Sequence, residues 1–178
     1  MADATLWLTP PREDLIPAMR DYVEEFHRAG EAFLQQHRQQ IAEDPASWLR
    51  RLHHLAAGLD LPPGIVPQSE YWLVADGRIV ATARLRHRLT DSLTVEGGHV
   101  GYEVRPSERR KGYASRLLAM MLDVGRQFGL GRVLVTCDAD NLASARVIRK
   151  NGGRYDGDGI STRTGKTVQR YWIELERP

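Results

Sequence analysis

The spacing of apolar positions divides the chain into a helical first part and a strand-rich remainder. Apolar side chains recur at three- and four-residue intervals over Ile16–Arg28 and Pro45–Ala57, which predicts two amphipathic helices. Asp44 stands where a helix N-cap is expected, and Gly58 stands where that helix should end. Ahead of both helices, ATLWLTPP (Ala4–Pro11) predicts a short strand that stops at its prolines, because proline cannot donate to a sheet.

From Tyr71 onward the period changes from helical to strand-like. The preceding segment 59–70 holds three prolines and a glycine and predicts an irregular connection. YWLVADGRIVATARLRHRL then predicts a β-hairpin that turns at Asp76-Gly77. The polar stretch Thr90–Gly98 predicts another turn, and His99–Val104 predicts a strand whose alternate residues face opposite sides.

A strand, helix, strand unit follows. An apolar helix is expected after Gly112, ending at the pair Gly129 and Gly131. Arg132–Cys137 is a nearly continuous apolar strand of the kind buried on both faces, and it should run parallel to the strand before the helix. Asn141–Lys150 predicts a further helix, and KTVQRYWIELE predicts a closing strand. The pattern as a whole predicts an α/β domain.

Composition narrows the class of protein. With 178 residues, 42% apolar and 27% charged, the chain (1–178) is expected to form one globular domain with a substantial core. The net charge of +2 does not favour a nucleic-acid partner. Its single cysteine, Cys137, excludes an internal disulfide and leaves no cysteine cluster for structural zinc, so no metal is expected. Without a membrane-length apolar run or a secretory signal, we expect a cytoplasmic protein with no membrane partner.

The stretch RRKGYASRLL (Arg109–Leu118) places positive charge and a glycine at the entrance of a helix. A helix start exposes unpaired backbone N–H groups and partial positive charge. Gly112 lets the main chain approach a bulky anion without an intervening side chain. These properties favour a phosphate site, and a solvated basic turn is the alternative that the spacing leaves open.

Two motifs resemble the GNAT superfamily of N-acetyltransferases. Arg109-x-x-Gly112-x-Ala114 is similar to the family's (Gln/Arg)-x-x-Gly-x-(Gly/Ala) motif. NLASARVIRKNGG, which begins at Asn141, resembles its Asn-x-x-(Ala/Ser) segment, and the motifs together cover Gly98–Gly153. The run GGHVGYEVRPSERRKGYA is also similar to an uncharacterised predicted-acetyltransferase branch. The resemblance implies a mixed sheet, flanked by helices, that splays between its central strands and holds acetyl-CoA in the gap.

The resemblance also divides the domain by role. Residues 1–70 would shape the acceptor side, 71–157 would form the coenzyme-binding core, and 158–178 would supply the C-terminal strand region. The pyrophosphate would sit on the backbone N–H groups of the glycine turn, and the pantetheine arm would pair with the main chain of the preceding strand. Helix capping is a second role that the residue type of Asn141 favours. The coenzyme-binding residues that this resemblance implies are Tyr102, Val104, Arg109, Arg110, Lys111, Gly112, Tyr113, Ala114, Ser115, Asn141 and Ser144.

Acyl transfer to an amine needs a base, because an ammonium group has no lone pair. Glu103 and His99 are the candidates, since they share one face of the strand beside the cleft, and Glu96 is the third. A structural ion pair of Glu103 with Arg105 or Arg84 is the alternative for that carboxylate. For His99 the alternative is a packed or exposed histidine without a catalytic role.

The leaving thiolate benefits from an acid, and here the chain departs from the family. Many members carry a tyrosine seven residues after the asparagine, a position that Ile148 occupies. Tyr155 or Tyr102 would substitute, or the thiolate would leave without a side-chain donor. Cys137 is expected to be a small core residue rather than an acyl carrier.

The leading hypothesis is a small-molecule N-acetyltransferase that uses acetyl-CoA. A protein N-acetyltransferase and a coenzyme-binding sensor without turnover are the alternatives. A flat acidic groove would favour peptides, and a closed pocket would favour metabolites. A homodimer is conceivable if the closing strand from Lys166 is exposed at a sheet edge.

Overall fold

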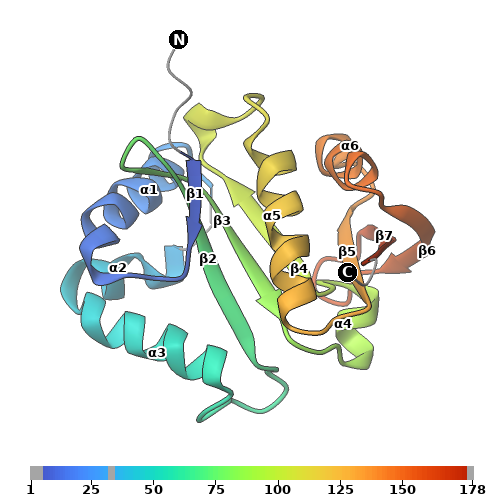
Figure 1. Ribbon diagram of the computed structural model, residues 1–178, viewed down its shortest axis with the longest axis horizontal. Coiled ribbons are helices and arrows are strands. Elements are labelled where there is room, and N and C mark those ends of the chain that lie inside the picture. The colour runs from blue at the N-terminus through green and yellow to red at the C-terminus, as the bar shows by residue number, and fades with distance from the viewer. Residues whose placement is uncertain (1–5, 32–34, 176–178) are drawn as a thin grey trace.

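The fold is a seven-stranded mixed sheet with helices on both faces (Figure 1). The computed structural model describes residues 6–31 and 35–175. The strands lie in the order β1-β2-β3-β4-β5-β7-β6. They are β1 Leu6–Thr9, β2 Gln68–Ala75, β3 Arg78–Arg86, β4 Val100–Val104, β5 Arg132–Asp138, β6 Arg154–Ile160 and β7 Thr167–Glu174. The helices are α1 Ile16–Arg28, α2 Gln35–Glu43, α3 Pro45–Ala57, α4 Asp91–Val95, α5 Tyr113–Gln127 and α6 Leu142–Lys150.

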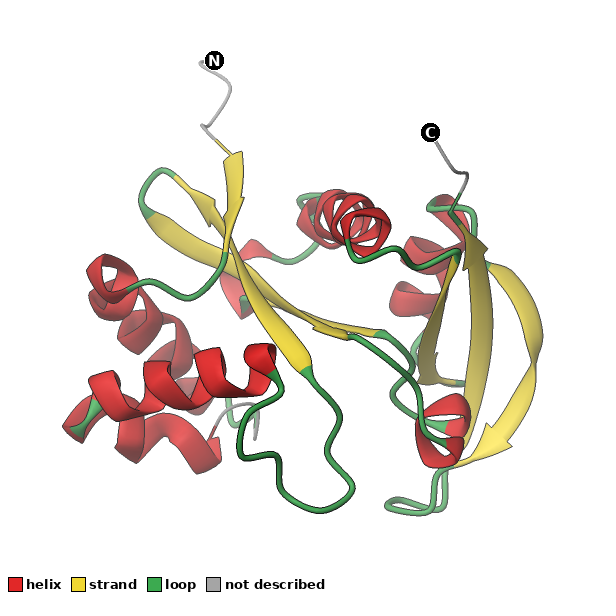
Figure 2. Ribbon diagram, turned by 60° about the horizontal axis from the view of Figure 1, so that its bottom comes forward, coloured by secondary structure: helices red, strands yellow, loops and turns green. Residues whose placement is uncertain are grey.

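The helices pack on the sheet in two layers. Figure 2 shows α1, α2 and α3 on one side of the first strands and α5 on the other. Beneath α1 and α3, the core includes Tyr22, Trp48 and Trp72, all nearly without solvent exposure. Beneath α5, the residues Leu117 and Met121 are fully buried against the sheet. Each layer therefore buries the apolar stripe that the helical spacing predicts.

The helices predicted from apolar spacing have the predicted bounds. The Asp44 carboxylate accepts a hydrogen bond from the Ser47 N–H at 3.0 Å, which caps α3. Gly58 ends this helix with φ of 71°, a conformation that favours glycine. The hairpin of β2 and β3 turns at Asp76-Gly77 as expected, although β2 begins at Gln68, inside the segment predicted to be irregular.

Three elements were not predicted. α2 is mostly polar, with Ile41 its buried anchor, so its apolar spacing gave no helical signal. α4 forms where a turn was predicted, because Thr90 caps it by accepting from the Leu93 N–H at 3.3 Å. β6 contains two glycines and alternates little, so only its pairing with β7 makes it a strand. Residues 4 and 5 of the predicted first strand lie outside the described residues.

The sheet opens between β4 and β5. These strands run parallel, as predicted, and Val100 opposite Val135 is the paired position between them in the described chain. At the closed end, the His99 N–H donates to the Leu134 carbonyl at 2.7 Å. Beyond this point the strands separate. From Gly101 onward, β4 stays paired with β3 along one edge, and its other edge faces a gap.

The closing strand is not at an edge of the sheet. β7 lies between β5 and β6, paired with both, so the edges are β1 and β6. The expectation of a dimer through an exposed strand from Lys166 is therefore wrong in its geometry, because that strand's main-chain groups are already paired on both sides. None of the helices in the described ranges is long and apolar enough to cross a membrane.

Candidate active site

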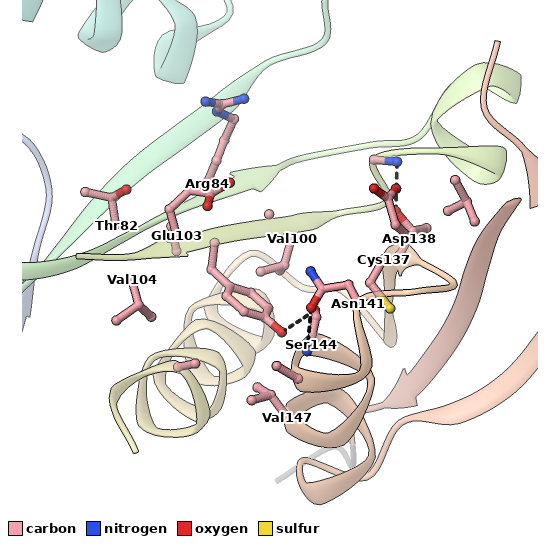
Figure 3. Close-up of a pocket in the computed structure, with 18 of the residues that line it drawn as sticks. Thr82, Arg84, Val100, Glu103, Val104, Cys137, Asp138, Asn141, Ser144 and Val147 are labelled. Carbon is pink, nitrogen blue, oxygen red and sulfur yellow. Dashed lines mark hydrogen bonds between the residues drawn. The ribbon is translucent and has the colours of Figure 1, made fainter. Parts of the chain in front are cut away.

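A cleft of about 1720 Å³ occupies the opening between β4 and β5 (Figure 3). Its lining comes from both faces of the sheet. Tyr102 and Val104 pack against the core beneath α5. Glu103 points away from Val104, to the side of the sheet on which Arg84 lies (Figure 3). The cleft thus extends from the entrance of α5 to the opposite face of the sheet, on which Glu103 lies. In the described chain, no three His, Cys, Asp or Glu residues are grouped so as to hold a metal ion.

The entrance of α5 presents bare backbone to this cleft. Gly112 has φ of 87° and precedes the helix, with no side-chain cap on the first turn. Gly112, Ala114 and Ser115 all line the cleft, as does Tyr113. Because the first N–H groups of a helix have no intrahelical acceptor, this turn can bind an anion.

The predicted cations of the turn divide into two sets. Arg110 lines the cleft, with φ of 62°. Lys111 does not line it and instead donates to the Glu108 carboxylate at 2.9 Å. Arg109 lines the cleft but donates to both carboxylate oxygens of Glu31, at 2.8 and 2.7 Å, and to the Val104 carbonyl at 3.2 Å. Glu31 therefore neutralises much of the charge that Arg109 brings to the cleft.

Two cations that the sequence reasoning missed lie on α6. Arg146 and Lys150 both line the cleft. They are four residues apart, so they share a face of the helix. This spacing, on the helix that begins after Asn141, was the sequence signal that could have predicted two cations facing the cleft.

Across the opening, β4 and α6 are joined by hydroxyl groups. The Tyr102 hydroxyl and Ser144 Oγ are 2.8 Å apart. Burial raises the pKa of Tyr102 to about 12. The Asn141 side-chain oxygen accepts from the Ser144 N–H at 3.1 Å, so Asn141 caps α6 and also lines the cleft. The Cys137 thiol lines the same region, and burial raises its pKa.

Glu103 is the candidate base that faces the cleft. Its side chain is exposed to the cleft, and partial desolvation by the cleft walls raises its pKa to about 7, against the opposing effect of Arg109. Among the described residues it forms no ion pair. Arg105, expected as its partner, is 2% exposed and pairs instead with Asp21 and Glu25. The backbone carbonyl of Glu103 accepts from the Tyr22 hydroxyl at 3.2 Å, which fixes the strand here.

His99 lies away from the cleft. It is 7% exposed, its Nδ1 accepts from the Leu134 N–H at 2.9 Å, and its ring packs against Trp172. Burial lowers its pKa to about 4, so the ring is neutral. The alternative of a packed histidine describes this position, because a side chain already bonded between two strands cannot reach the substrate.

Tyr155 and Glu96 also have other partners. Tyr155 is 54% exposed on the edge strand β6, outside the cleft, and its hydroxyl donates to Asp158 at 2.8 Å. Glu96 lines the cleft. It accepts from Ser161 at 2.6 Å and from Arg163 at 2.8 Å, and these bonds lower its pKa. Of the candidate acids, Tyr102 alone lies in the cleft lining of the described chain.

Residues 5–154 match the acetyltransferase (GNAT) domain family. The chain belongs to this family. Membership confirms the expected fold and class of protein, since members of the family are acyltransferases that use acetyl-CoA as the cosubstrate. The chain is also 36% identical over 59 residues to the uncharacterised N-acetyltransferase YnaD of Bacillus subtilis (strain 168). That match spans 33% of the chain and 35% of the relative's length.

Solved structures of this family share the fold. RimL, a ribosomal L7/L12 alpha-N-protein acetyltransferase in complex with coenzyme A, superposes with a TM-score of 0.71 at 20% identity, covering 100% of this chain and 98% of RimL. A putative acetyltransferase of Salmonella typhimurium with acetyl-CoA gives a TM-score of 0.62 at 14% identity, covering 97% and 95%. A spermidine N-acetyltransferase chimera from Vibrio cholerae gives 0.62 at 11% identity, covering 97% and 96%.

Proposed function

We propose that the protein is an N-acetyltransferase that transfers the acetyl group of acetyl-CoA directly to an amine within a ternary complex. One observation carries this proposal. The uncapped helix entrance at Gly112 and the carboxylate of Glu103, whose pKa is about 7, line the same cleft. A phosphate-binding turn and a base of near-neutral pKa are the two parts that acyl transfer from a coenzyme thioester to an ammonium group needs.

The coenzyme would lie along the opening of the sheet. The N–H groups from Gly112 to Ser115 would hold its pyrophosphate, with Arg110, Arg146 and Lys150 adding positive charge. Along Gly101 to Val104, the main-chain groups on the edge that faces the gap would pair with the pantetheine amides. The Val104 carbonyl already accepts from Arg109, so a pantetheine amide would share or displace that bond. Asn141 would contribute its amide beside that arm while it caps α6.

The reaction moves two protons off the nitrogen and one onto the sulfur. Glu103 would take the first proton from the acceptor ammonium, and the freed nitrogen lone pair would form a bond to the thioester carbonyl carbon. A backbone N–H of β4 would stabilise the developing oxyanion. As the carbon–sulfur bond breaks, the Tyr102 hydroxyl would give its proton to the thiolate, and the second proton lost by the newly bonded nitrogen would restore that hydroxyl. The hydrogen bond with Ser144 would hold the Tyr102 hydroxyl in position. Tyr102 would thus take the role of the tyrosine that many family members have at the position of Ile148, which is fully buried here.

The acceptor is proposed to be a small-molecule amine. The cleft is neither closed nor uniformly acidic, since both carboxylates and arginines line it. A protein α-amine is the second candidate, favoured by the extent of the cleft, whose lining also includes Glu96 and Arg163. Acetylation of peptides with free N-termini, compared with small amines at equal concentration, separates the two.

Release of free thiol from acetyl-CoA over a panel of amines tests the proposed activity. We expect turnover with at least one acceptor and a mass increase of one acetyl group on that acceptor. Tight binding of acetyl-CoA without turnover on any acceptor would instead support a sensor. Binding of acetyl-CoA that is unaffected by substitution of Gly112 would contradict the assigned coenzyme site.

Cys137 offers a separate test of where the pantetheine arm ends. The solved RimL complex contains a disulfide between coenzyme A and one of its own cysteines. Cys137 is the one cysteine of this chain and lines the cleft. Coenzyme A disulfide should exchange with its thiol to give a mixed disulfide and one free coenzyme A. Intact-mass analysis, with Cys137→Ser as the control, detects this adduct, and no adduct would place the coenzyme thiol elsewhere.

A further inference from the structure

The acceptor side of the cleft contains an arginine whose charge is only partly neutralised by a neighbouring carboxylate. Arg84 projects from β3 beside Glu103 of β4, on the same side of the sheet (Figure 3). Its Nε lies 3.5 Å from a carboxylate oxygen of Glu70 on β2. Among the described residues this is its one ion pair, and its two terminal amino groups have no hydrogen-bond partner there. The two terminal amino groups of the Arg84 guanidinium are therefore available to a ligand.

The other cations around Glu70 are arranged differently. Arg86 donates to the carbonyls of Gly97 at 2.8 Å and Gly98 at 3.1 Å, so it fastens the turn before β4. Arg51 on α3 donates to Nδ1 of His37 on α2 at 3.2 Å. Since arginine cannot accept, the bonded nitrogen of His37 carries no proton.

This region has an excess of positive charge. Burial, with Arg51 and Arg84 as neighbours, lowers the pKa of His37 to about 4. Burial and Arg84 lower the pKa of Arg86 to about 10, and the same two causes lower that of Arg51. Glu70 is the carboxylate within this group, and Glu103 lies beside it. An added anion would relieve the repulsion among these cations, whereas an added cation would increase it.

The surface of the sheet between Arg84 and Glu103 is not covered by a side chain. Arg84 stands directly opposite Gly101 on β4, and Glu103 follows two residues later. A Cβ at Gly101 would meet no atom within 4 Å, so no side chain fills the space between the two charged groups. Diagonal neighbours on paired strands have Cβ atoms about 7 Å apart, which a small molecule can span.

We propose that the acceptor carries an oxyanion, a carboxylate or a phosphate, a few bonds from its amine, and that Arg84 binds this oxyanion while Glu103 faces the amine. The inference rests on the proposed acetyltransferase function and narrows its substrate to amino-acid-like or aminoalkyl phosphate acceptors. The planar fork of arginine suits both oxyanions, because each offers two acceptor oxygens. Glu70 lies at the Nε side of the guanidinium, which leaves the two terminal amino groups to bind a ligand in the cleft.

Matched acceptors test the inference on the unaltered protein. We would compare α-, β- and γ-amino acids with their amides, and aminoethyl phosphate with ethanolamine, by kcat/KM at fixed acetyl-CoA. A charge-assisted contact predicts a preference of about tenfold or more for the anionic member of at least one pair. The pair with the larger preference identifies the oxyanion as carboxylate or phosphate.

Substitution of Arg84 then locates the contact. Arg84→Gln should reduce the preference to near unity. The ratio of kcat/KM within each pair is the readout, because Arg84 also lowers the pKa of Glu103 and its loss would affect both members of a pair alike. Arg88→Gln is the matched control, because Arg88 is an exposed arginine just beyond the same strand and outside the cleft lining. Thermal unfolding of Arg84→Gln and of Arg84→Gln/Glu70→Gln shows whether Glu70, left without its partner, has destabilised the fold.

The outcomes separate this inference from the proposed function. Turnover with equal kcat/KM for each acid and its neutral partner, or a preference that survives Arg84→Gln, overturns the inference and leaves the acetyltransferase intact. If no acceptor is acetylated, calorimetric titration of the same pairs into the coenzyme A-loaded protein gives their affinities. Equal affinities within each pair overturn the inference there, and a preference lost in Arg84→Gln supports it although the activity proposal has failed.

Discussion

The Tyr102 hydroxyl lies 2.8 Å from Ser144 Oγ, across the point where β4 and β5 separate. This hydrogen bond connects the strand that would carry the pantetheine to the helix that begins at Asn141. The position at which many family members have a tyrosine is the buried Ile148, so the phenol that faces the cleft comes from a different element.

Removal of this hydroxyl pair should slow the chemical step. Tyr102→Phe is expected to lower kcat by about 100-fold, in the range for a lost general acid, with little change in the KM for acetyl-CoA. Ser144→Ala should have a smaller effect in the same direction. Steady-state kinetics measure both, with Tyr155→Phe as a control outside the cleft. A kcat that is unchanged in Tyr102→Phe would mean that the thiolate leaves without this donor.

The pH profile should report Glu103. Because the base must be ionised and desolvation raises its pKa to about 7, kcat/KM should rise with pH and level off above about pH 7. Arg109 favours the ionised form, so Arg109→Gln should move this limb to higher pH. Glu103→Gln should lower kcat/KM by about 100-fold or more and remove the limb. A limb that persists in Glu103→Gln would assign the base elsewhere.

Gly112→Glu should abolish coenzyme binding by placing a bulky anion at the helix entrance. A residue with a Cβ at φ of 87° is strained, by about 1–2 kcal/mol, whatever space surrounds it. Gly129→Glu is therefore the matched control, since Gly129 has φ of 74°, also has open space around its Cα, and follows the other end of α5. Both variants should lose similar stability in thermal unfolding, and the variant at Gly112 alone should lose acetyl-CoA binding. Equal binding by the two would contradict a phosphate site here.

His99 should make the fold sensitive to acid. Its pKa is lowered to about 4 in the folded protein by burial, from an ordinary value of 6.5. The unfolded chain therefore binds a proton between these values while the folded one does not, so stability is present above pH 6.5 and is lost as the pH falls toward 4. The loss from this group is on the order of 3 kcal/mol.

Denaturant unfolding at several pH values measures this effect. His99→Asn keeps an acceptor for the Leu134 N–H, so it should fold, with a weaker decline in stability between pH 6.5 and pH 4. His37 titrates in the same range and is unchanged in that variant, so the difference between the two proteins isolates His99. Identical pH dependence in both proteins would show that His99 is not protected from protonation.

Local sequence determined the elements whose residues interact with near neighbours. The stripe of α1, the Asp44 cap of α3 and the turn at Asp76-Gly77 each depend on contacts within a few residues, so spacing and residue type were sufficient. The glycine at the entrance of α5 belongs to the same class, because the need for φ near 87° is a property of a single residue.

Tertiary structure decided what depends on partners distant in the chain. Glu103 and His99 were expected to share one face of the strand and to be equally available to a substrate. In the structure, the Leu134 N–H donates to the His99 ring and holds it between two strands, whereas Glu103 lines the cleft. Long-range packing also decided three other features. It placed β7 inside the sheet, brought the Tyr102 hydroxyl to Ser144, and left Arg84 with Glu70 as its ion-pair partner. A residue type specifies which bonds a side chain can make, but only the packing of strands and helices determines which partners come within reach and how much water remains around them.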